Sequence, residues 1–180
     1  RLRSSILIEG KILVDCGPDI ISQFSIFNLQ FSKINGIIIT HQHKDHIAGL
    51  DKIDINKGKV IYPQTGQKLK IDGLKIEAFK TPHSKIIPTI GLIIAKDVVY
   101  LPDCSHLTRK VRKNLTPAKL LILDGSVWER DFGGHEAIKK QLKILQRFKV
   151  LGKKSQVYFT HNGHTRIPHQ ELEKQIQALG

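Results

Sequence analysis

One short run of residues constrains this chain more than any other. His41, His43, Asp45 and His46 fall within six positions, directly after the apolar segment 36–40. Imidazole is the commonest protein ligand for zinc, and carboxylate is its usual companion. Residues two apart in an extended segment point the same way, so His41 and His43 can share one ion. If the chain then turns into a helix, Asp45 and His46 can face a second ion, and the run therefore predicts a metal site.

Further candidate ligands follow other apolar segments. His83 comes after segment 74–80, Asp103 after 98–101 and His161 after 156–160. Taken singly each is ambiguous. A lone His is more often structural or exposed than a ligand, and an Asp that follows a strand is usually a turn or cap residue. All three nevertheless share one placement, at the carboxyl end of a predicted strand, where loops gather into a site. We therefore expect these three side chains to complete a two-metal site.

Local patterns predict a mixed α/β (α+β) fold. Short runs rich in β-branched residues and bounded by turn residues predict strands; these cover 5–9, 11–15, 36–40, 59–62, 74–80, 89–95, 98–101, 120–124 and 156–160. Apolar residues at helical spacing predict helices over 134–148 and 169–179, and a shorter helix is expected over 18–27. Strands followed by helices indicate two sheets with helices outside, in a single domain spanning residues 1–180.

The charge balance favours anionic ligands. The chain has 29 Lys and Arg against 16 Asp and Glu, a net charge of +13, and such a field attracts phosphates or nucleic acid. The basic residues are spread along the chain, and the densest group is Arg109, Lys110, Arg112 and Lys113. Nucleic acid is therefore one candidate partner, and a solvated lysine-rich surface is the alternative.

Other features bear on location. Cys16 and Cys104 are too few for a disulfide framework, which predicts a reducing, cytoplasmic setting. No apolar run approaches the ~20 residues needed to cross a bilayer, so we expect no membrane span. The first residues do not look like a signal peptide. Because the chain begins at Arg1 and contains no Met, we expect either that its natural start is missing or that it is part of a longer product.

The His-x-His-x-Asp-His pattern, followed by strand-end His, Asp and His in this order, resembles the metallo-β-lactamase superfamily. Within it the chain is most similar to the phosphodiesterases, which include phosphoribosyl cyclic phosphodiesterase and ribonuclease Z. Asp15-Cys16-Gly17 resembles the Asp-x-Gly turn of the family, and Gly134-His135 resembles its Gly-His helix start. The likeness implies an αββα sandwich that lacks its usual first strand, which would precede Arg1.

The resemblance also implies residue roles. One metal would take His41, His43 and His83, and the other Asp45, His46 and His161, with Asp103 bridging. Zn²⁺ is the first choice for both divalent ions, with Mn²⁺ or Fe²⁺ as alternatives. The ions would hold a bridging hydroxide that attacks a phosphodiester. His135 would protonate the leaving alkoxide, with His164 as the alternative, and Asp45 would serve catalysis as well as metal binding.

The sequence leaves the substrate open. The leading hypothesis is a phosphodiesterase that cleaves a small cyclic phosphate or a nucleotide. A nuclease of the ribonuclease Z type acting on RNA or DNA is favoured by the charge, but no binding arm is evident. A glyoxalase II-like thioesterase is a weaker alternative, because the region around His83 and His135 matches it less well. A non-catalytic member of the fold is disfavoured because the ligand set is complete. The oligomeric state is also open, and a homodimer is compatible with the sequence.

Overall fold

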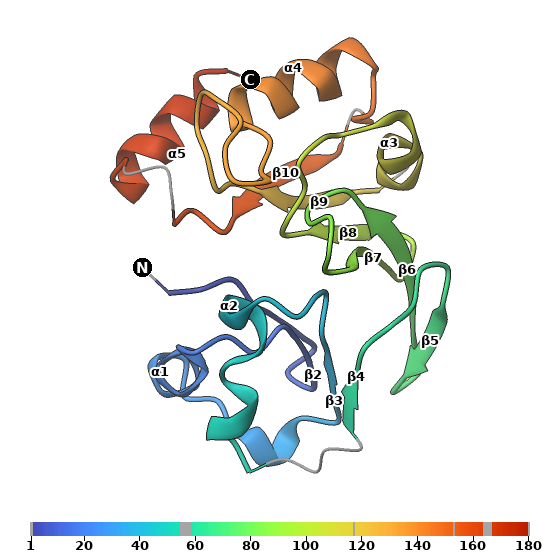
Figure 1. Ribbon diagram of the computed structural model, residues 1–180, viewed down its shortest axis with the longest axis vertical. Coiled ribbons are helices and arrows are strands. Elements are labelled where there is room, and N and C mark those ends of the chain that lie inside the picture. Colours follow the sequence, from blue (N-terminus) through green and yellow to red (C-terminus); the bar gives the residue numbers. More distant parts are fainter. Residues whose placement is uncertain (1, 55–58, 117, 153, 164–166, 180) are drawn as a thin grey trace.

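The computed structural model describes residues 2–54, 59–116, 118–152, 154–163 and 167–179. Two β-sheets face each other, with helices on their outer sides (Figure 1). The strand order is β1-β2-β3-β4 in the first sheet and β10-β9-β8-β7-β6-β5 in the second. This arrangement confirms the predicted two-sheet α/β architecture.

The first half of the chain builds the smaller sheet. Strands β1 and β2 pair antiparallel, and β3 and β4 are added in parallel. The elements are β1 (Ile6–Ile8), β2 (Ile12–Val14), α1 (Ile20–Ile26), β3 (Gly36–Ile38), α2 (Lys44–Ile47) and β4 (Val60–Ile61), with 3₁₀ turns at Phe31–Lys33 and Leu50–Lys52.

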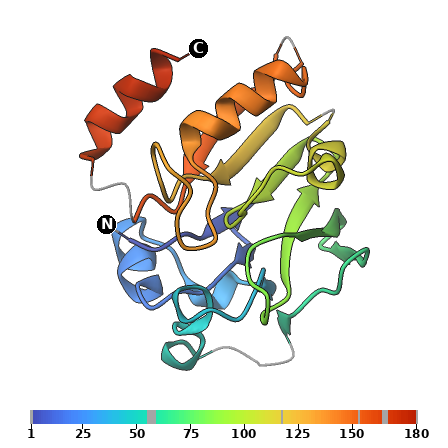
Figure 2. The ribbon, with the colours of Figure 1, turned by 45° about the horizontal axis from the view of Figure 1, so that its top comes forward.

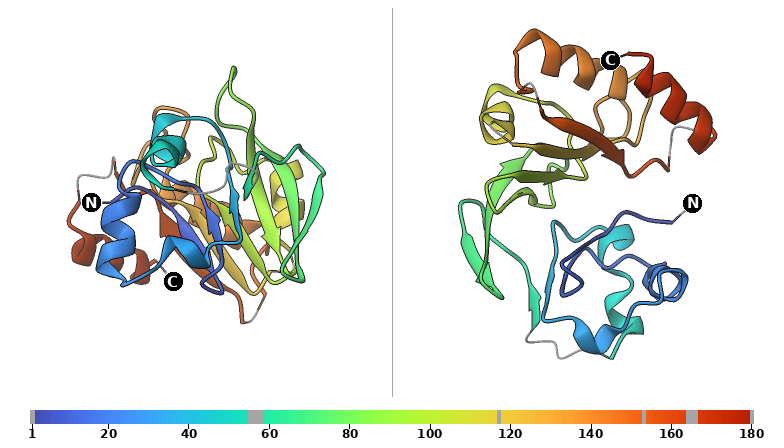
Figure 3. Two further views of the ribbon diagram at one scale, coloured as in Figure 1. Left: turned by 90° about the horizontal axis from the view of Figure 1, so that it is seen from below. Right: turned by 180° about the vertical axis from the view of Figure 1, so that it is seen from behind.

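The second half builds the larger sheet. Its strands β5 to β8 form an antiparallel meander, and β8, β9 and β10 run parallel to one another. The elements are β5 (Lys68–Ile71), β6 (Leu74–Thr81), β7 (Thr89–Ile94), β8 (Val98–Leu101), α3 (Arg109–Leu115), β9 (Leu120–Asp124), α4 (Ile138–Arg147), β10 (Gln156–Thr160) and α5 (His169–Gln177). Figure 3 shows the two halves from below and from behind.

Alternate residues of the central strands pack into different cores. Val14 of β2 packs between the sheets with Tyr100 of β8, whereas Leu13 packs outward with Phe24 of α1. Val99 likewise packs outward, in the core that α3 and α4 cover. Because successive side chains of a strand point to opposite faces, both faces of these strands are buried. This explains why the strands are nearly continuous apolar runs.

Helix α4 packs on the second sheet, and α5 packs on α4. Leu145 of α4 lies in the core formed with the sheet, while Leu142 on the same helix packs against Leu172 of α5. Figure 2 shows α5 lying beside α4. No helix in the described ranges is long and apolar enough to cross a membrane.

The structure corrects two details of the predicted helices. The expected helix 134–148 begins only at Ile138. Gly133 and Gly134 have positive φ angles of 60° and 87°, which form a turn and are incompatible with an α-helix. Helix α5 ends at Gln177, so the expected apolar residue Leu179 lies beyond it and is exposed.

Two elements, β5 and α3, were not predicted. Strand β5 alternates Lys with apolar residues over only four positions. Helix α3 is mostly basic, but Val111 and Leu115 are buried on one face, and Thr108 caps it by accepting a hydrogen bond from the Val111 N–H. A basic surface group therefore turned out to be the exposed side of an amphipathic helix.

Candidate metal centre

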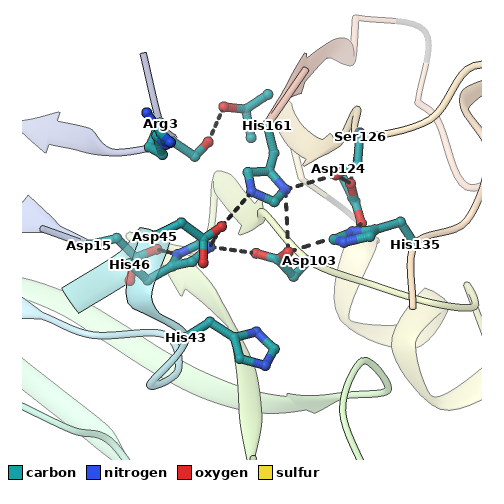
Figure 4. Close-up of polar contacts among 12 residues, drawn as sticks. Arg3, Asp15, His43, Asp45, His46, Asp103, Asp124, Ser126, His135 and His161 are labelled. Carbon is teal, nitrogen blue, oxygen red and sulfur yellow. Dashed lines mark hydrogen bonds and ion pairs between the residues drawn. The ribbon is translucent and has the colours of Figure 1, made fainter. Parts of the chain in front are cut away.

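The seven predicted ligand residues come together at one edge of the two sheets. Figure 4 shows five of them, His43, Asp45, His46, Asp103 and His161. His41 and His43 follow β3, and Asp45 and His46 lie on α2. The other three come from the second sheet, each just beyond the carboxyl end of its strand: His83 after β6, Asp103 after β8 and His161 after β10. The expected placement of these residues at strand ends is what the structure shows.

Three imidazoles converge in the first group. His41 Nε2 lies 2.8 Å from His43 Nδ1, which lies 3.2 Å from His83 Nε2. One nitrogen from each ring lies within 4.8 Å of the other two. His43 has extended backbone, which lets its side chain point the same way as that of His41. This group can hold one cation.

Asp45, His46 and His161 form the second group. Asp45 Oδ2 lies 3.0 Å from His161 Nε2 and 3.6 Å from His46 Nε2. Because α2 begins directly after His43, Asp45 and His46 lie on this short helix, and the centre of the His46 ring is 4.2 Å from that of His41. His161 holds its position with a positive φ of 62°, a conformation that non-glycine residues adopt at a cost.

Asp103 lies between the two groups. Its Oδ2 is 3.0 Å from His46 Nε2, and its Oδ1 is 3.8 Å from His83 Nε2. Asp103 Oδ2 and His46 Nε2 are both buried, and neither forms a hydrogen bond within the described part of the chain. Buried polar atoms are normally satisfied, and a cation held between these two would satisfy both. The donor atoms therefore fit divalent metal ions that accept nitrogen and oxygen ligands.

In three of the histidines, the ring nitrogen that faces away from the centre has a polar partner of its own. His46 Nδ1 lies 2.9 Å from Asp15 Oδ2, and His161 Nδ1 lies 2.7 Å from Ser126 Oγ. His83 Nδ1 lies 3.0 Å from the carbonyl oxygen of Gly134. Such contacts fix the tautomer and orientation of metal-binding histidines, and they leave Nε2 directed at the centre.

Burial and neighbouring charges shift the pKa values of several side chains in the centre. Burial and then the neighbouring His46 lower the pKa of His41 to about 3. Burial also lowers the pKa of His46, but Asp15 and Asp103 outweigh it and raise this pKa to about 11. The hydrogen bond with His161 holds the pKa of Asp45 well below its usual value. Asp45 is therefore ionised, whereas His46 carries a proton that a metal ion must displace.

His135 lies beside the ligands, but not at a helix start as expected. It precedes the first residue of α4 and pairs with Phe132 in an isolated β-bridge. Its Nδ1 lies 2.8 Å from Asp124 Oδ2 and 3.6 Å from Asp103 Oδ1. Asp124 is fully buried and also accepts a hydrogen bond from the Cys104 N–H. The ring is thus held by a fixed carboxylate.

Asp15, Asp124 and Ser126 are the supporting residues to which the sequence prediction gave no role. The Asp15-Cys16-Gly17 turn was the available signal for the first of them. A Cβ on Gly17 would lie 2.2 Å from the Asp45 carbonyl oxygen, so only glycine lets this turn pack against α2. The turn then places Asp15 against His46, with Asp15 itself at a positive φ of 61°.

Three other residues named from the sequence have different outcomes. His164, the alternative proton donor, lies outside the described residues. Cys16 and Cys104 are both buried and form no disulfide. Burial raises the pKa of the Cys16 thiol to about 12 and that of Cys104 in the same direction. Both thiols are therefore protonated at neutral pH and do not compete with the imidazoles for metal.

Comparison with known proteins agrees with this fold. Residues 57–162 match the family described as the beta-lactamase superfamily domain, and residues 4–58 match the anti-Pycsar protein Apyc1 family. A diphosphatase from the PhnP family superposes with a TM-score of 0.79 at 24% identity, over 97% of this chain and 78% of that one. Zn²⁺-bound PqqB from Methylobacterium extorquens superposes with a TM-score of 0.72 at 16% identity, over 98% and 82%.

A curated relative is matched over only part of its length. The octanoyltransferase of Porphyromonas gingivalis is 22% identical over 212 aligned positions, which cover 96% of this chain. The chain spans only 42% of that protein. Since the beta-lactamase superfamily pattern covers more than half of the chain, the protein belongs to this superfamily and has the metallo-β-lactamase fold.

Proposed function

We propose that this protein is a phosphodiesterase that uses two divalent metal ions, Zn²⁺ being the first choice. The observation that carries the proposal is the pair of converging donor groups with Asp103 between them. His41, His43 and His83 would hold one ion, and Asp45, His46 and His161 the other. The Zn²⁺ bound to PqqB, which shares the fold, supports zinc.

Bound ions of this kind supply a nucleophile at neutral pH and neutralise the charge of a phosphate group. The side chains of the chain itself would do the rest. Asp45 has a side chain that is 37% exposed, so it is placed to orient water arriving from solvent. The buried ligands, in contrast, keep the charged groups of the centre in a fixed geometry from which bulk water is excluded.

His135 would donate the proton that the leaving alkoxide needs. When water attacks phosphorus and the bond to the leaving oxygen breaks, that oxygen must gain a proton. Asp124 holds Nδ1 of His135, so Nε2 is the atom that would give the proton. A carboxylate partner also stabilises the protonated ring, as a general acid requires.

A phosphodiester is favoured over other esters by charge and by likeness. The net charge of +13 attracts anionic substrates. The PhnP-family diphosphatase, with the same fold, acts on a phosphate compound by its name. The acyl chemistry named for the octanoyltransferase is not carried over, because more than half of that protein lies outside the match.

The test combines metal analysis with turnover. We expect purified protein loaded with Zn²⁺ or Mn²⁺ to hold close to two ions per chain and to hydrolyse bis-p-nitrophenyl phosphate. The His43→Ala variant should lose both properties, whereas His106→Ala, which changes an exposed histidine outside the centre, should keep them. Protein that takes up no metal after loading would refute the proposal.

Replacing His135 separates metal binding from proton transfer. We expect His135→Ala to retain both ions and to lose turnover by roughly 10²–10⁴-fold, the usual contribution of a general acid. A substrate with an activated leaving group, such as p-nitrophenolate, should be affected less than an alkyl phosphodiester, because it needs less protonation. Loss of metal in this variant would instead make His135 a ligand.

A second candidate function, cleavage of RNA or DNA strands, is favoured by a specific feature. The basic group of the sequence analysis lies on one exposed helix, α3, and residues of that helix line a surface hollow. A long anionic substrate would have a second place to bind there.

A further inference from the structure

A basic groove lies between α3 and the segment that follows α4. It is a surface hollow of about 470 Å³. Figure 1 shows the end of α4 beside α3. The residues that line it are Arg109, Arg112, Lys113, Thr116, Phe148 and Val150.

The basic groove is remote from the metal centre. Thr116 follows α3 shortly before β9 begins, and Phe148 and Val150 precede β10. These parallel strands carry Asp124 and His161 at or just beyond their other ends. Five residues of strand span roughly 17 Å at about 3.3 Å per residue. The groove therefore lies at the opposite edge of the sheet and is no part of the pocket that receives the scissile bond.

The basic charges around this groove are not neutralised. Elsewhere on the surface, several basic side chains have acidic partners: Lys119 pairs with Asp97, Lys139 with Glu129 and Lys140 with Asp131. Around the groove, no ion pair to an acidic side chain forms within the described ranges for Arg109, Lys110, Arg112, Lys113, Arg147 or Lys149. Such a concentration of unpaired positive charge attracts a polyanion.

An aromatic ring lines the same groove. The guanidinium carbon of Arg112 lies 3.9 Å from the centre of the Phe148 ring, and that of Arg147 lies 5.5 Å from it. Arg112 is held in place by donating a hydrogen bond to the Leu107 carbonyl oxygen. Half of the Phe148 surface is exposed. Phe148 and Arg112 thus present flat π surfaces beside the flexible cations Arg109 and Lys113.

We propose that the basic groove binds single-stranded nucleic acid at a site separate from the metal centre. Arg109 and Lys113 would contact phosphates, and a base would stack on the Phe148–Arg112 pair. Proteins that bind single strands without sequence preference combine these two elements, a positive groove and an aromatic platform. An acidic peptide would use the charges and leave the aromatic platform unused, so the platform favours nucleic acid.

The test is a binding titration with a fluorescent 20-nucleotide oligothymidine, followed by anisotropy on metal-loaded protein. For Arg109→Ala/Lys113→Ala we expect roughly tenfold or greater loss of affinity at low salt, and a salt slope lower by about 1.4, because single strands give about 0.7 per phosphate contact. Phe148→Leu keeps an apolar side chain but removes the ring, and it should weaken binding roughly tenfold with an unchanged salt slope.

A matched control removes two lysines from another surface. Lys68→Ala/Lys75→Ala changes the net charge equally, on strands β5 and β6, and should leave affinity within about twofold of the original protein. Equal losses in both double variants would overturn the proposal, as would displacement of the probe by polyglutamate of the same length. A denaturing gel confirms that the probe is intact. Because binding rather than turnover is measured, the result stands apart from the phosphodiesterase proposal.

Discussion

The two ends of strands β9 and β10 lie beside charged side chains in different surroundings, buried at one end and exposed at the other. At the carboxyl ends, Asp124 and His161 enter a buried network in which carboxylates lie against imidazoles. At the amino ends, the basic groove exposes arginine and lysine side chains to solvent. A buried charge is costly unless it is paired, whereas an exposed charge is screened by water and ions. We therefore expect changes at the metal centre to affect both fold and chemistry, and changes at the groove to affect binding alone.

The largest effect should follow from Asp103→Ala. Removing this carboxylate takes away the group between the two donor sets and leaves His46 without one of its three acidic partners. We expect loss of metal and a fall in turnover of roughly a thousandfold or more, since metal ions supply several kcal/mol of transition-state stabilisation. Metal analysis and phosphodiester turnover measure this, with Asp97→Ala as a control on an exposed carboxylate. Two retained ions would show that Asp103 is no ligand.

A smaller effect is expected for Asp15→Asn. The amide keeps the shape of the side chain but removes the charge that faces His46 Nδ1 at 2.9 Å. Loss of a residue that orients a ligand typically costs about 10–100-fold in metal affinity. Competition with a chromophoric chelator measures the affinity directly. Unchanged affinity would mean that the ring of His46 is held by packing alone.

The proton on His46 predicts a dependence on pH. Its pKa in the folded, metal-free protein is about 11, above the ordinary value of 6.5. Metal bound at His46 must displace this proton, so affinity should rise with pH by up to about tenfold per unit at any pH below about 11. Calorimetry in two buffers of different ionisation enthalpy would detect the released proton.

The same shift has a defined sign for stability. Because the folded pKa is raised, the stabilising contribution in the metal-free protein is complete below pH 6.5 and is lost as pH rises through about 11. Urea unfolding of metal-free protein should therefore shift to lower midpoints as the medium becomes alkaline. A midpoint that rises over this range would contradict the assigned His46 charge.

The smallest effect on folding is expected at the other end of the strands. Arg109→Ala/Lys113→Ala removes two exposed side chains, and the free energy of unfolding should change by no more than about 0.5 kcal/mol. Urea unfolding of the same variant used in the binding test provides the measurement. Marked destabilisation would mean that these side chains support α3 rather than a ligand.

How much could be predicted from the sequence depended on how local each signal was. The group from His41 to His46 could be found because four possible metal ligands lie within six consecutive positions of the sequence. His83, Asp103 and His161 could be found because each follows a recognisable strand, and strand ends gather at an edge. Those juxtapositions are now observed, whereas metal binding by these residues stays a prediction.

The supporting residues could not be predicted in the same way. Asp15 reaches His46 because β2 pairs with β3, and the pattern of neither strand specifies that register. Ser126 meets His161 through the pairing of β9 with β10, 35 positions apart in the chain. His135 was misplaced because apolar spacing locates the helix but not the glycine turn that delays its start.

Asp45 and His161 are 116 positions apart in the sequence, so they are synthesised at different times. A ribosome adds about 5–20 residues per second, so Asp45 is synthesised roughly 6–23 seconds before His161. During that interval His161 cannot yet contribute to the centre. If these residues bind metal as proposed, stable metal binding requires the completion of β10.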